Sequence, residues 1–265
     1  MTRLFVFARD DLVAPAATLG LDAVVVDLER RGKPARQRGV DTDISVNGVD
    51  DVRRVRATTD LPLVCRIDGR GPHRCAQVDA VLEAGVDEIL IPMVRRPDEV
   101  TEVMAQVGTS AGVGIMVETT DAVDRAAELA ALPLSRVYVG LNDLWIDRRG
   151  RHRFDPFVDG TIDTLAGRFA STPFGVAGLT HPDLGDPLPC RHLINELARI
   201  GCDYTFLRRS FFHALEHRAA AEICDAIRHG LAVAAGRPAD EIERDRRAAH
   251  RAISALAPEP LGVPA

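Results

Sequence analysis

The sequence predicts an α/β fold, a (β/α)8 barrel of the TIM type with additional C-terminal helices. Eight short apolar runs rich in β-branched residues alternate with segments of helical periodicity, which is the pattern of repeated βα units around a parallel sheet. The chain has 265 residues, the usual size of one such barrel. A doubly wound open sheet is the alternative, and it is disfavoured because no Gly-x-Gly-x-x-Gly motif follows the first strand.

The eight predicted strands are short and apolar, as expected for strands that are buried on both faces. In chain order they are residues 4–7, 23–28, 63–67, 88–93, 113–117, 137–141, 174–179 and 204–207. Residue types typical of helix boundaries lie between them. Pro97 begins a predicted helix over 98–106. Glycines stand where four helices should end: Gly20, Gly85, Gly108 and Gly201.

Helical sequence continues after the eighth strand, over residues 211–228 and 239–256. The second segment has a thin apolar stripe and many charged residues, which is typical of an accessory or intersubunit helix. We therefore predict one domain over residues 1–256, with accessory helices at about 209–256. The final stretch, residues 257–265, is rich in proline and glycine and is predicted to be a disordered tail.

Composition restricts the possible partners. The formal net charge of −6 argues against a nucleic-acid surface, so a small molecule is the expected partner. Five cysteines without a Cys-x-x-Cys motif suggest reduced thiols. The chain shows neither a signal-peptide pattern at its start nor an apolar run long enough for a membrane helix, and we expect a cytoplasmic protein without membrane contact.

Two predicted strands lead into a single carboxylate each, and these acids are the first site candidates. Glu118 follows the fifth strand, and Asp143 follows the sixth. Ligands of barrel proteins bind at the carboxyl ends of the strands, where two neighbouring acids could share a divalent cation. The alternative is that each acid simply favours the start of the next helix. The pattern alone leaves both interpretations open.

Other strand ends add charged candidates. Strand two ends in Asp27, Glu29 and Arg30, and Arg66 lies at the end of strand three. A guanidinium group at that depth requires a partner, so Arg66 is expected to pair with Asp27 or Glu29, to contact substrate, or both. We expect Asp27, Arg30 and a glycine at the end of strand seven, Gly178, to contribute to substrate binding.

The positions of the lysine and the histidines restrict the possible types of catalysis. Lys33 is the single lysine, and it lies in a polar segment, so Schiff-base catalysis has no good candidate and carbonyl chemistry would need a metal. The histidines show no zinc-binding spacing. Among them His181, just after strand seven, is best placed for acid or base work.

Five motifs occur in a characteristic order. They are Asp27-Leu28-Glu29, Cys65-Arg66-Ile67, Ile89-Leu90-Ile91-Pro92-Met93-Val94, Val117-Glu118-Thr119 and Gly140-Leu141-Asn142-Asp143-Leu144. With these motifs the chain resembles the citrate lyase β-subunit / HpcH–HpaI aldolase family of the phosphoenolpyruvate and pyruvate barrel superfamily. The resemblance covers roughly residues 4–207.

The resemblance implies a divalent metal, Mg²⁺ or Mn²⁺, on Glu118 and Asp143. It also implies that Arg66 faces the substrate carboxylate or the developing enolate oxygen. The expected activity is carbon–carbon cleavage of a 2-oxo acid or a related carboxylate, because metal and arginine would stabilise the charge that develops in the transition state. A homotrimer or homohexamer is implied as well.

The chain departs from the family at one informative position. Aldolases of the family carry histidine directly after the strand-two glutamate, where this chain has Arg30. The base could then be Glu29, His181 or a metal-bound water. Two alternatives remain, an acyl-CoA lyase or thioesterase of the citrate lyase β-subunit type and a scaffold protein with altered or lost catalysis. Four arginines after strand six could bind coenzyme A phosphates: Arg148, Arg149, Arg151 and Arg153. The favoured interpretation is that this run is a solvated loop.

Overall fold

The computed structural model describes residues 1–30 and 47–259. Within these ranges, eight parallel strands close into a barrel in chain order, and the last strand pairs with the first. The strands are β1 (Arg3–Phe7), β2 (Ala23–Asp27), β3 (Leu63–Arg66), β4 (Glu88–Ile91), β5 (Gly112–Val117), β6 (Arg136–Val139), β7 (Phe174–Gly178) and β8 (Tyr204–Leu207). The predicted barrel is confirmed, and each strand lies within two residues of its predicted bounds.

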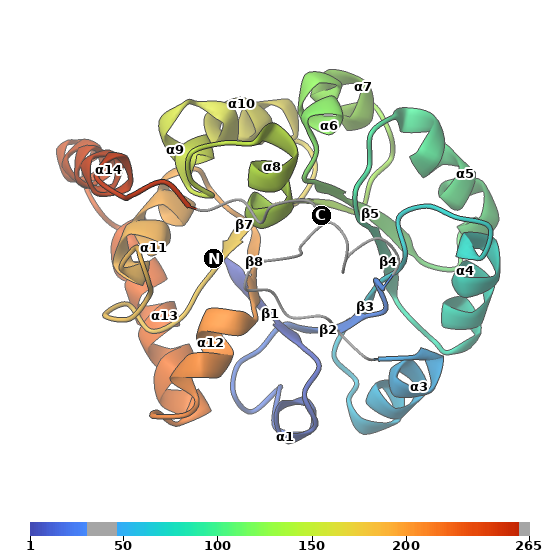
Figure 1. Ribbon diagram of the computed structural model, residues 1–265. Helices are drawn as coiled ribbons and strands as arrows, with labels where there is room; N and C mark the ends of the chain where they lie inside the picture. Colours follow the sequence, from blue (N-terminus) through green and yellow to red (C-terminus); the bar gives the residue numbers. More distant parts are fainter. Residues whose placement is uncertain (31–46, 260–265) are drawn as a thin grey trace.

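Helices surround the barrel as an outer ring (Figure 1). They are α1 (Asp10–Val13), α3 (Val49–Thr58), α4 (Arg74–Glu83), α5 (Pro97–Val107), α6 (Thr120–Asp124), α7 (Ala126–Ala130), α8 (Leu141–Arg148), α9 (Asp155–Val158), α10 (Thr161–Arg168), α11 (Cys190–Arg199), α12 (Arg209–Ala214), α13 (Ala220–Ala235) and α14 (Ala239–Ser254). The four predicted helix-ending glycines all have positive φ, between 57° and 84°. This backbone conformation favours glycine over residues with a Cβ.

The helical segment predicted over 211–228 differs from the structure. It is divided into α12 and α13, because residues 215–218 form turns and Ala219 is extended with φ −67° and ψ 143°. The long accessory helix α14 packs against α11 and α9 at the outside of the molecule (Figure 1). Within the described residues, no helix is long and apolar enough to cross a membrane.

The barrel interior is filled by side chains that alternate along the strands. Inward positions form a separate apolar cluster, made of Phe5, Phe7, Ala23, Val25, Val64, Leu90, Met116, Tyr138, Tyr204 and Phe206. Strand side chains alternate between the two faces, so the residue two positions further along a strand also points inward. Asp27, Arg66, Glu118 and Arg208 each follow a cluster member by two positions. The strand period therefore directs four charged side chains toward the carboxyl-end mouth of the barrel.

A buried ion pair occupies the opposite end of the barrel. Arg136 of β6 donates from Nε to a carboxylate oxygen of Glu88 on β4, across the intervening strand β5. Gly114 of β5 makes room for this pair, because a Cβ there would lie 2.7 Å from the Cγ of Arg136 and 2.8 Å from a Glu88 carboxylate oxygen. Gly112 is packed as closely, because a Cβ there would lie 2.9 Å from the Ser135 Cβ.

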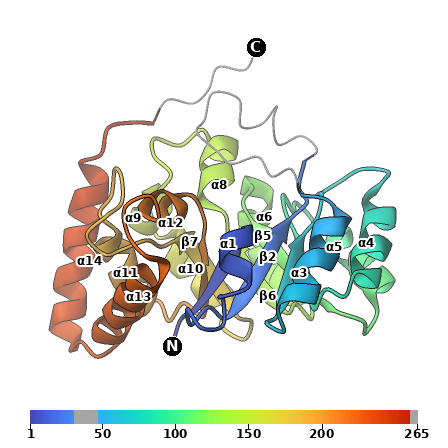
Figure 2. The same ribbon diagram turned by 90° about the horizontal axis from the view of Figure 1, so that it is seen from below.

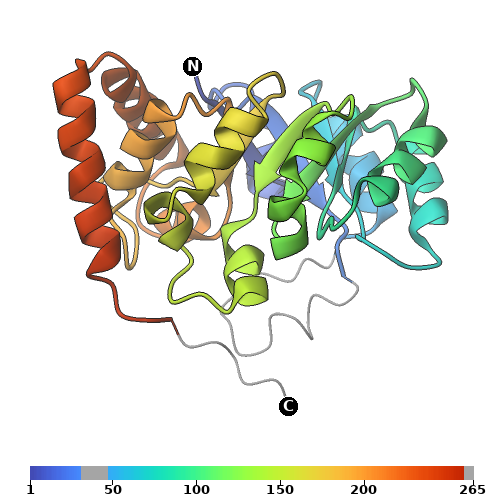
Figure 3. The same ribbon diagram turned by 90° about the horizontal axis from the view of Figure 1, so that it is seen from above.

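The site lies at the end of the barrel away from the N-terminus. Two side views show the N-terminus at one end and the α8 region beyond the strands at the other (Figures 2 and 3). Asp143 lies on α8, directly after β6. Glu118 follows β5 without a gap. The connections after these two strands therefore carry the predicted metal ligands to the same end.

Candidate active site

Glu118 and Asp143 line the same pocket at the carboxyl ends of the strands. The Glu118 side chain is buried, with 1% of the residue exposed, and its Oε1 accepts a hydrogen bond of 2.8 Å from the Met93 main-chain N–H. Gly140 lies against this carboxylate, because a Cβ at that position would overlap its Oε2. Asp143 lies in the first turn of α8 and is 6% exposed. The two predicted metal ligands are thus brought together.

The protonation of Glu118 reflects its surroundings. Burial, followed by the negative charges of Asp143 and Glu29, raises the pKa of the Glu118 carboxyl to about 8. The positive charge of Arg66 and the Met93 N–H act in the opposite direction. Several acids that compete for protons in a buried site are stabilised together when a cation replaces the proton.

This donor set fits a hard divalent cation that shares its coordination with a substrate. Within the described part of the chain, no group of three or more His, Cys, Asp or Glu side chains is arranged as metal ligands. Mg²⁺ is commonly held by one or two carboxylates while water and substrate oxygens fill its other positions. Glu118 and Asp143 provide two such carboxylates in one pocket, and their mutual repulsion is the structural reason to expect a cation between them.

Arg66 is fixed by two acids from β2. Its Nε and one terminal nitrogen donate to both carboxylate oxygens of Asp27, at 2.8 and 2.5 Å. Its other terminal nitrogen lies 3.5 Å from a Glu29 oxygen. Arg66 was predicted to pair with Asp27 or Glu29, and in the structure it pairs with both. Arg66 also lines the pocket, so the geometry allows pairing and substrate contact at the same time.

A second arginine shares the same carboxylate. Arg208, directly after β8, donates to Asp27 at 3.0 Å and lines the pocket next to Arg66. The guanidinium carbons of Arg66 and Arg208 lie 5.6 and 4.3 Å from the centroid of the Phe7 ring, within the range of cation–π attraction. Asp27 and Phe7 thus hold two positive groups in the lining of the pocket.

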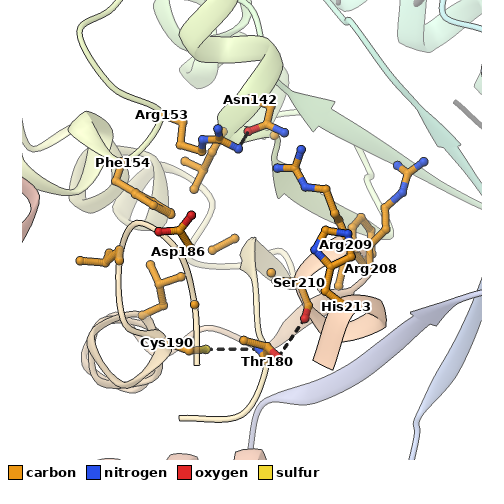
Figure 4. A pocket seen from close by; sticks show the side chains of 18 of the residues that line it. Asn142, Arg153, Phe154, Thr180, Asp186, Cys190, Arg208, Arg209, Ser210 and His213 are labelled. Carbon is orange, nitrogen blue, oxygen red and sulfur yellow. Dashed lines mark hydrogen bonds between the residues drawn. The ribbon is translucent and has the colours of Figure 1, made fainter. Parts of the chain in front are cut away.

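The pocket has a volume of about 960 Å³. Its floor is apolar and is made by the inward cluster of the barrel, including Met116, Tyr138 and Phe206. Its two sides carry polar groups, with Arg153, Phe154 and Asn142 on one side and Arg208, Arg209 and His213 on the other (Figure 4). An apolar floor below charged side walls strengthens electrostatic interactions with a bound anion.

Strand β7 is distorted where it borders the pocket. The pairing of β7 with β8 shifts between Gly175 and Gly178, and Ala177 has φ +58°. The Tyr138 hydroxyl donates to the Ala177 carbonyl oxygen, and the Tyr138 ring stacks on Phe206 at 3.9 Å. This bulge brings the predicted substrate-binding residue Gly178 into the pocket lining.

The remaining predicted residues lie behind or beside the pocket. Asp27 and Glu29 are buried behind Arg66 and do not belong to the lining residues. The Arg30 main-chain N–H donates to Asp68, and its guanidinium donates to the Asn47 carbonyl at 2.5 Å. Arg30 is likewise outside the lining. Lys33 lies outside the described residues.

His181 also lies outside the pocket lining. Its Nδ1 accepts the Asp183 main-chain N–H at 3.3 Å, and its Nε2 lies 3.4 Å from a terminal nitrogen of Arg218. Both ring nitrogens therefore face neighbours in the β7–α11 connection and in the connection between α12 and α13. Another histidine, His213 of α12, lines the pocket instead.

Sequence analysis did not single out His213 and Glu259 as pocket residues. His213 follows β8 in a segment assigned to accessory helices, and Glu259 belongs to the predicted tail. Arg208 directly follows strand eight, and the alternation along β8 directs it into the pocket because Phe206 is an inward position. Of the basic run after α8, Arg149 and Arg151 are exposed, whereas Arg153 is half-buried and lines the pocket.

Solved structures of similar fold were found for most of the chain. RipC from Yersinia pestis has 16% identity and a TM-score of 0.60, covering 91% of this chain and 98% of that one. A citrate lyase from Burkholderia xenovorans LB400 has 15% identity and a TM-score of 0.61, covering 96% and 83%. Protein CitE from Mycobacterium tuberculosis, in complex with magnesium and pyruvate, has 18% identity and a TM-score of 0.60, covering 94% and 98%. These similarities support the fold.

A search of curated proteins gave no match. The sequence model of the HpcH/HpaI aldolase/citrate lyase family matches residues 2–155, which is more than half of the chain. The matched region contains Asp27, Arg66, Glu118 and Asp143, and it ends in the segment after α8. The resemblance inferred from the motifs is confirmed, and the chain belongs to the HpcH/HpaI aldolase/citrate lyase family.

Proposed function

We propose that the protein is a divalent-metal-dependent carbon–carbon lyase of the aldolase type that acts on a 2-oxo acid. Membership in the family supports a lyase. The observation that carries the finer assignment is the placement of Glu118, Asp143 and Arg66 in the lining of one pocket at the carboxyl ends of the strands. Two acids and an adjacent arginine match the chelating oxygens and the negative charge of such a substrate.

Glu118 and Asp143 would hold Mg²⁺ or Mn²⁺. When bound, the metal would act as a Lewis acid on a carbonyl oxygen. Arg66, fixed by Asp27, is positioned to bind the substrate carboxylate and to stabilise negative charge that develops on the enolate oxygen. Because Asp27 and Glu29 hold Arg66 before substrate binds, this stabilisation needs little reorganisation during the reaction.

The apolar floor has a complementary role. Met116, Tyr138 and Phe206 lie below the charged groups and exclude water from that side of the substrate. Exclusion of water protects a carbanion-like intermediate from uncontrolled protonation and strengthens its interaction with Arg66. The bulge at Ala177, held by the Tyr138 hydroxyl, shapes the neighbouring wall.

A 2-oxo acid is favoured over a coenzyme A thioester. Three of the four basic residues that could meet coenzyme A phosphates are already engaged within the chain. Arg148 donates to the Thr161 hydroxyl at 3.0 Å, and Arg151 donates to Asp155 at 2.9 Å and to the Leu256 carbonyl at 2.5 Å. We therefore propose a small carboxylate substrate.

The proposal is tested with the variants Glu118→Gln and Asp143→Asn. Mn²⁺ binding is measured by calorimetry, and enolate formation is measured as metal-dependent deuterium exchange at the methyl group of pyruvate. Both variants should lose metal binding and exchange while retaining the circular dichroism spectrum of the wild type. Asp98→Asn is the control, because Asp98 lies on the exterior in an exposed pair with Arg96. Wild-type Mn²⁺ affinity in both site variants would overturn the metal assignment.

A further inference from the structure

The pocket already holds a carboxylate, that of Glu259. The segment after α14 brings this residue to the pocket wall, where it is a lining residue with an 11% exposed side chain. Its Oε1 accepts a hydrogen bond of 2.6 Å from the Arg153 Nε and lies 3.2 Å from the His152 Nε2. Its Oε2 accepts from the Arg153 main-chain N–H at 3.3 Å. One carboxylate thus meets a guanidinium, an imidazole and an amide.

The imidazole of His152 is oriented to donate to this carboxylate. Its Nδ1 accepts the Phe154 main-chain N–H at 3.2 Å, so the neutral ring carries its proton on Nε2, which faces Glu259. The ring is buried and stacks on Phe154, with centroids 5.3 Å apart. Packing of the ring therefore fixes the direction of the donor.

This carboxylate site adjoins the predicted metal pair. A terminal nitrogen of Arg153 donates to the Asn142 side-chain oxygen at 3.1 Å, and Asn142 directly precedes Asp143 (Figure 4). The Trp145 ring, with its centroid 5.9 Å from the guanidinium carbon, supports Arg153 from the side of α8. The donors lie in the connection between α8 and α9, whereas the carboxylate that they bind comes from the segment after α14.

The segment that carries Glu259 is held mainly by hydrogen bonds to residues that precede Glu259. Arg151 donates to the main-chain carbonyls of Ile253 and Leu256, and the Glu259 N–H donates to the Arg151 carbonyl at 2.9 Å. Displacement of the Glu259 side chain therefore leaves the two anchors at Ile253 and Leu256 in place. The arrangement combines a fixed set of donors with an exchangeable occupant.

We propose that Arg153 and His152 form a second carboxylate-binding subsite of the pocket, which Glu259 occupies until the distal carboxylate of a dicarboxylic substrate displaces it. The inference rests on the proposed function, which places the 2-oxo acid end of the substrate at Glu118, Asp143 and Arg66. The substrate class is then a 2-oxo dicarboxylic acid, with one carboxylate at Arg66 and the other at Arg153.

The test compares a ligand with one carboxylate and a ligand with two. Dissociation constants of pyruvate and of 2-oxoadipate are measured by calorimetry for the Mg²⁺-saturated full-length protein. Arg153→Gln should weaken 2-oxoadipate binding about tenfold relative to pyruvate binding, because one charge-assisted interaction with the distal carboxylate is lost. Glu259→Gln should strengthen 2-oxoadipate binding by several-fold, because the competing charge is removed. Glu243→Gln, in an exposed pair on α14, is the matched control.

The outcomes separate the two proposals. If pyruvate binds but the ratio of the two dissociation constants is the same in wild type, Arg153→Gln and Glu259→Gln, the subsite is overturned while the proposed function stands. Weaker 2-oxoadipate binding in Glu259→Gln also overturns it, since Glu259 would then complete the site rather than compete for it. If neither ligand binds to the wild type, the proposed function fails. Hydrogen exchange of residues 257–259 gives a second readout, and 2-oxoadipate but not pyruvate should accelerate it.

Discussion

Asp27 and Arg66 are register partners on the neighbouring strands β2 and β3, and two hydrogen bonds of 2.8 and 2.5 Å join their side chains. Both residues are buried. The alternation along each strand directs both side chains into the barrel, so the pairing follows from the strand register. This pair fixes the position of the Arg66 guanidinium in the pocket lining.

Asp27→Asn should destabilise the protein and impair substrate binding. The variant leaves Arg66 with less compensation for its buried charge, and loss of one partner of a buried pair costs about 3 to 5 kcal/mol. Urea unfolding measures the free energy of unfolding, and pyruvate binding reports on the site. Asp11→Asn is the control, because its pair with Arg9 is exposed and should contribute less than about 1 kcal/mol. Equal effects of the two variants would contradict the role assigned to Asp27.

Metal affinity should increase with pH up to about pH 8. The pKa of the Glu118 carboxyl is raised to about 8 by burial and by Asp143 and Glu29, so below that pH a cation must displace a proton. The apparent Mn²⁺ association constant should rise about tenfold per pH unit between pH 6 and pH 8 and then level off. Calorimetry in buffers of different ionisation enthalpy should also detect one released proton. A flat profile over this range would contradict the assignment of Glu118.

The same shift predicts how stability depends on pH without metal. The folded protein holds the Glu118 proton more tightly than the unfolded chain, whose carboxyl has the usual pKa of 4.5. The stabilising contribution is therefore complete below pH 4.5 and is lost as the pH rises toward 8. Saturating Mn²⁺ should reverse this loss at pH 8. Thermal unfolding at several pH values, with and without Mn²⁺, measures both effects.

Gly140→Ala should remove metal binding without altering the local backbone conformation. Gly140 has φ −87° and ψ 93°, which alanine adopts readily, but its new Cβ would overlap the Glu118 Oε2. Displacement of the carboxylate should weaken Mn²⁺ binding at least about tenfold, and overpacking should destabilise the protein by about 1 to 3 kcal/mol. Gly167→Ala on α10, where a Cβ meets open space, should instead stabilise the protein by up to about 1 kcal/mol. Unchanged Mn²⁺ affinity in Gly140→Ala would contradict this geometry.

His181→Gln should leave turnover nearly unchanged. Although its position after strand seven suggested acid or base chemistry, its ring nitrogens face Asp183 and Arg218 outside the pocket lining. Steady-state kinetics of the metal-dependent deuterium exchange of pyruvate should show a kcat close to that of the wild type. His213→Gln, at a residue that lines the pocket, is the comparison. A large loss of kcat in His181→Gln alone would restore His181 as the catalytic acid or base.

The barrel could be predicted because buried parallel strands are continuous apolar runs of nearly fixed length. The inward direction of Arg66 and Glu118 also follows from sequence, because each lies two positions after an inward apolar residue, Val64 and Met116. The direction of His181 could not be predicted in this way. It belongs to a connection without a regular period, and its orientation depends on a contact with Arg218 from the connection between α12 and α13.

Contacts between residues far apart in the sequence could not be predicted either. Arg208 shares Asp27 with Arg66 across 181 residues of sequence, and Glu259 meets Arg153 across 106. No local pattern reports such contacts, because they arise from the closure of the barrel and from the path of the segment after α14. Metal identity, a cytoplasmic location and the trimer or hexamer stay predictions.

The filled interior of the barrel determines the order in which a cleavage reaction can finish. Phe5, Tyr204 and the Arg136–Glu88 pair pack the barrel below the pocket, so ligands enter and leave at the carboxyl-end mouth. A lyase forms two products from one substrate. The fragment nearer the mouth must then depart before the fragment held at Arg66, and product inhibition by the deeper fragment should be competitive with the substrate.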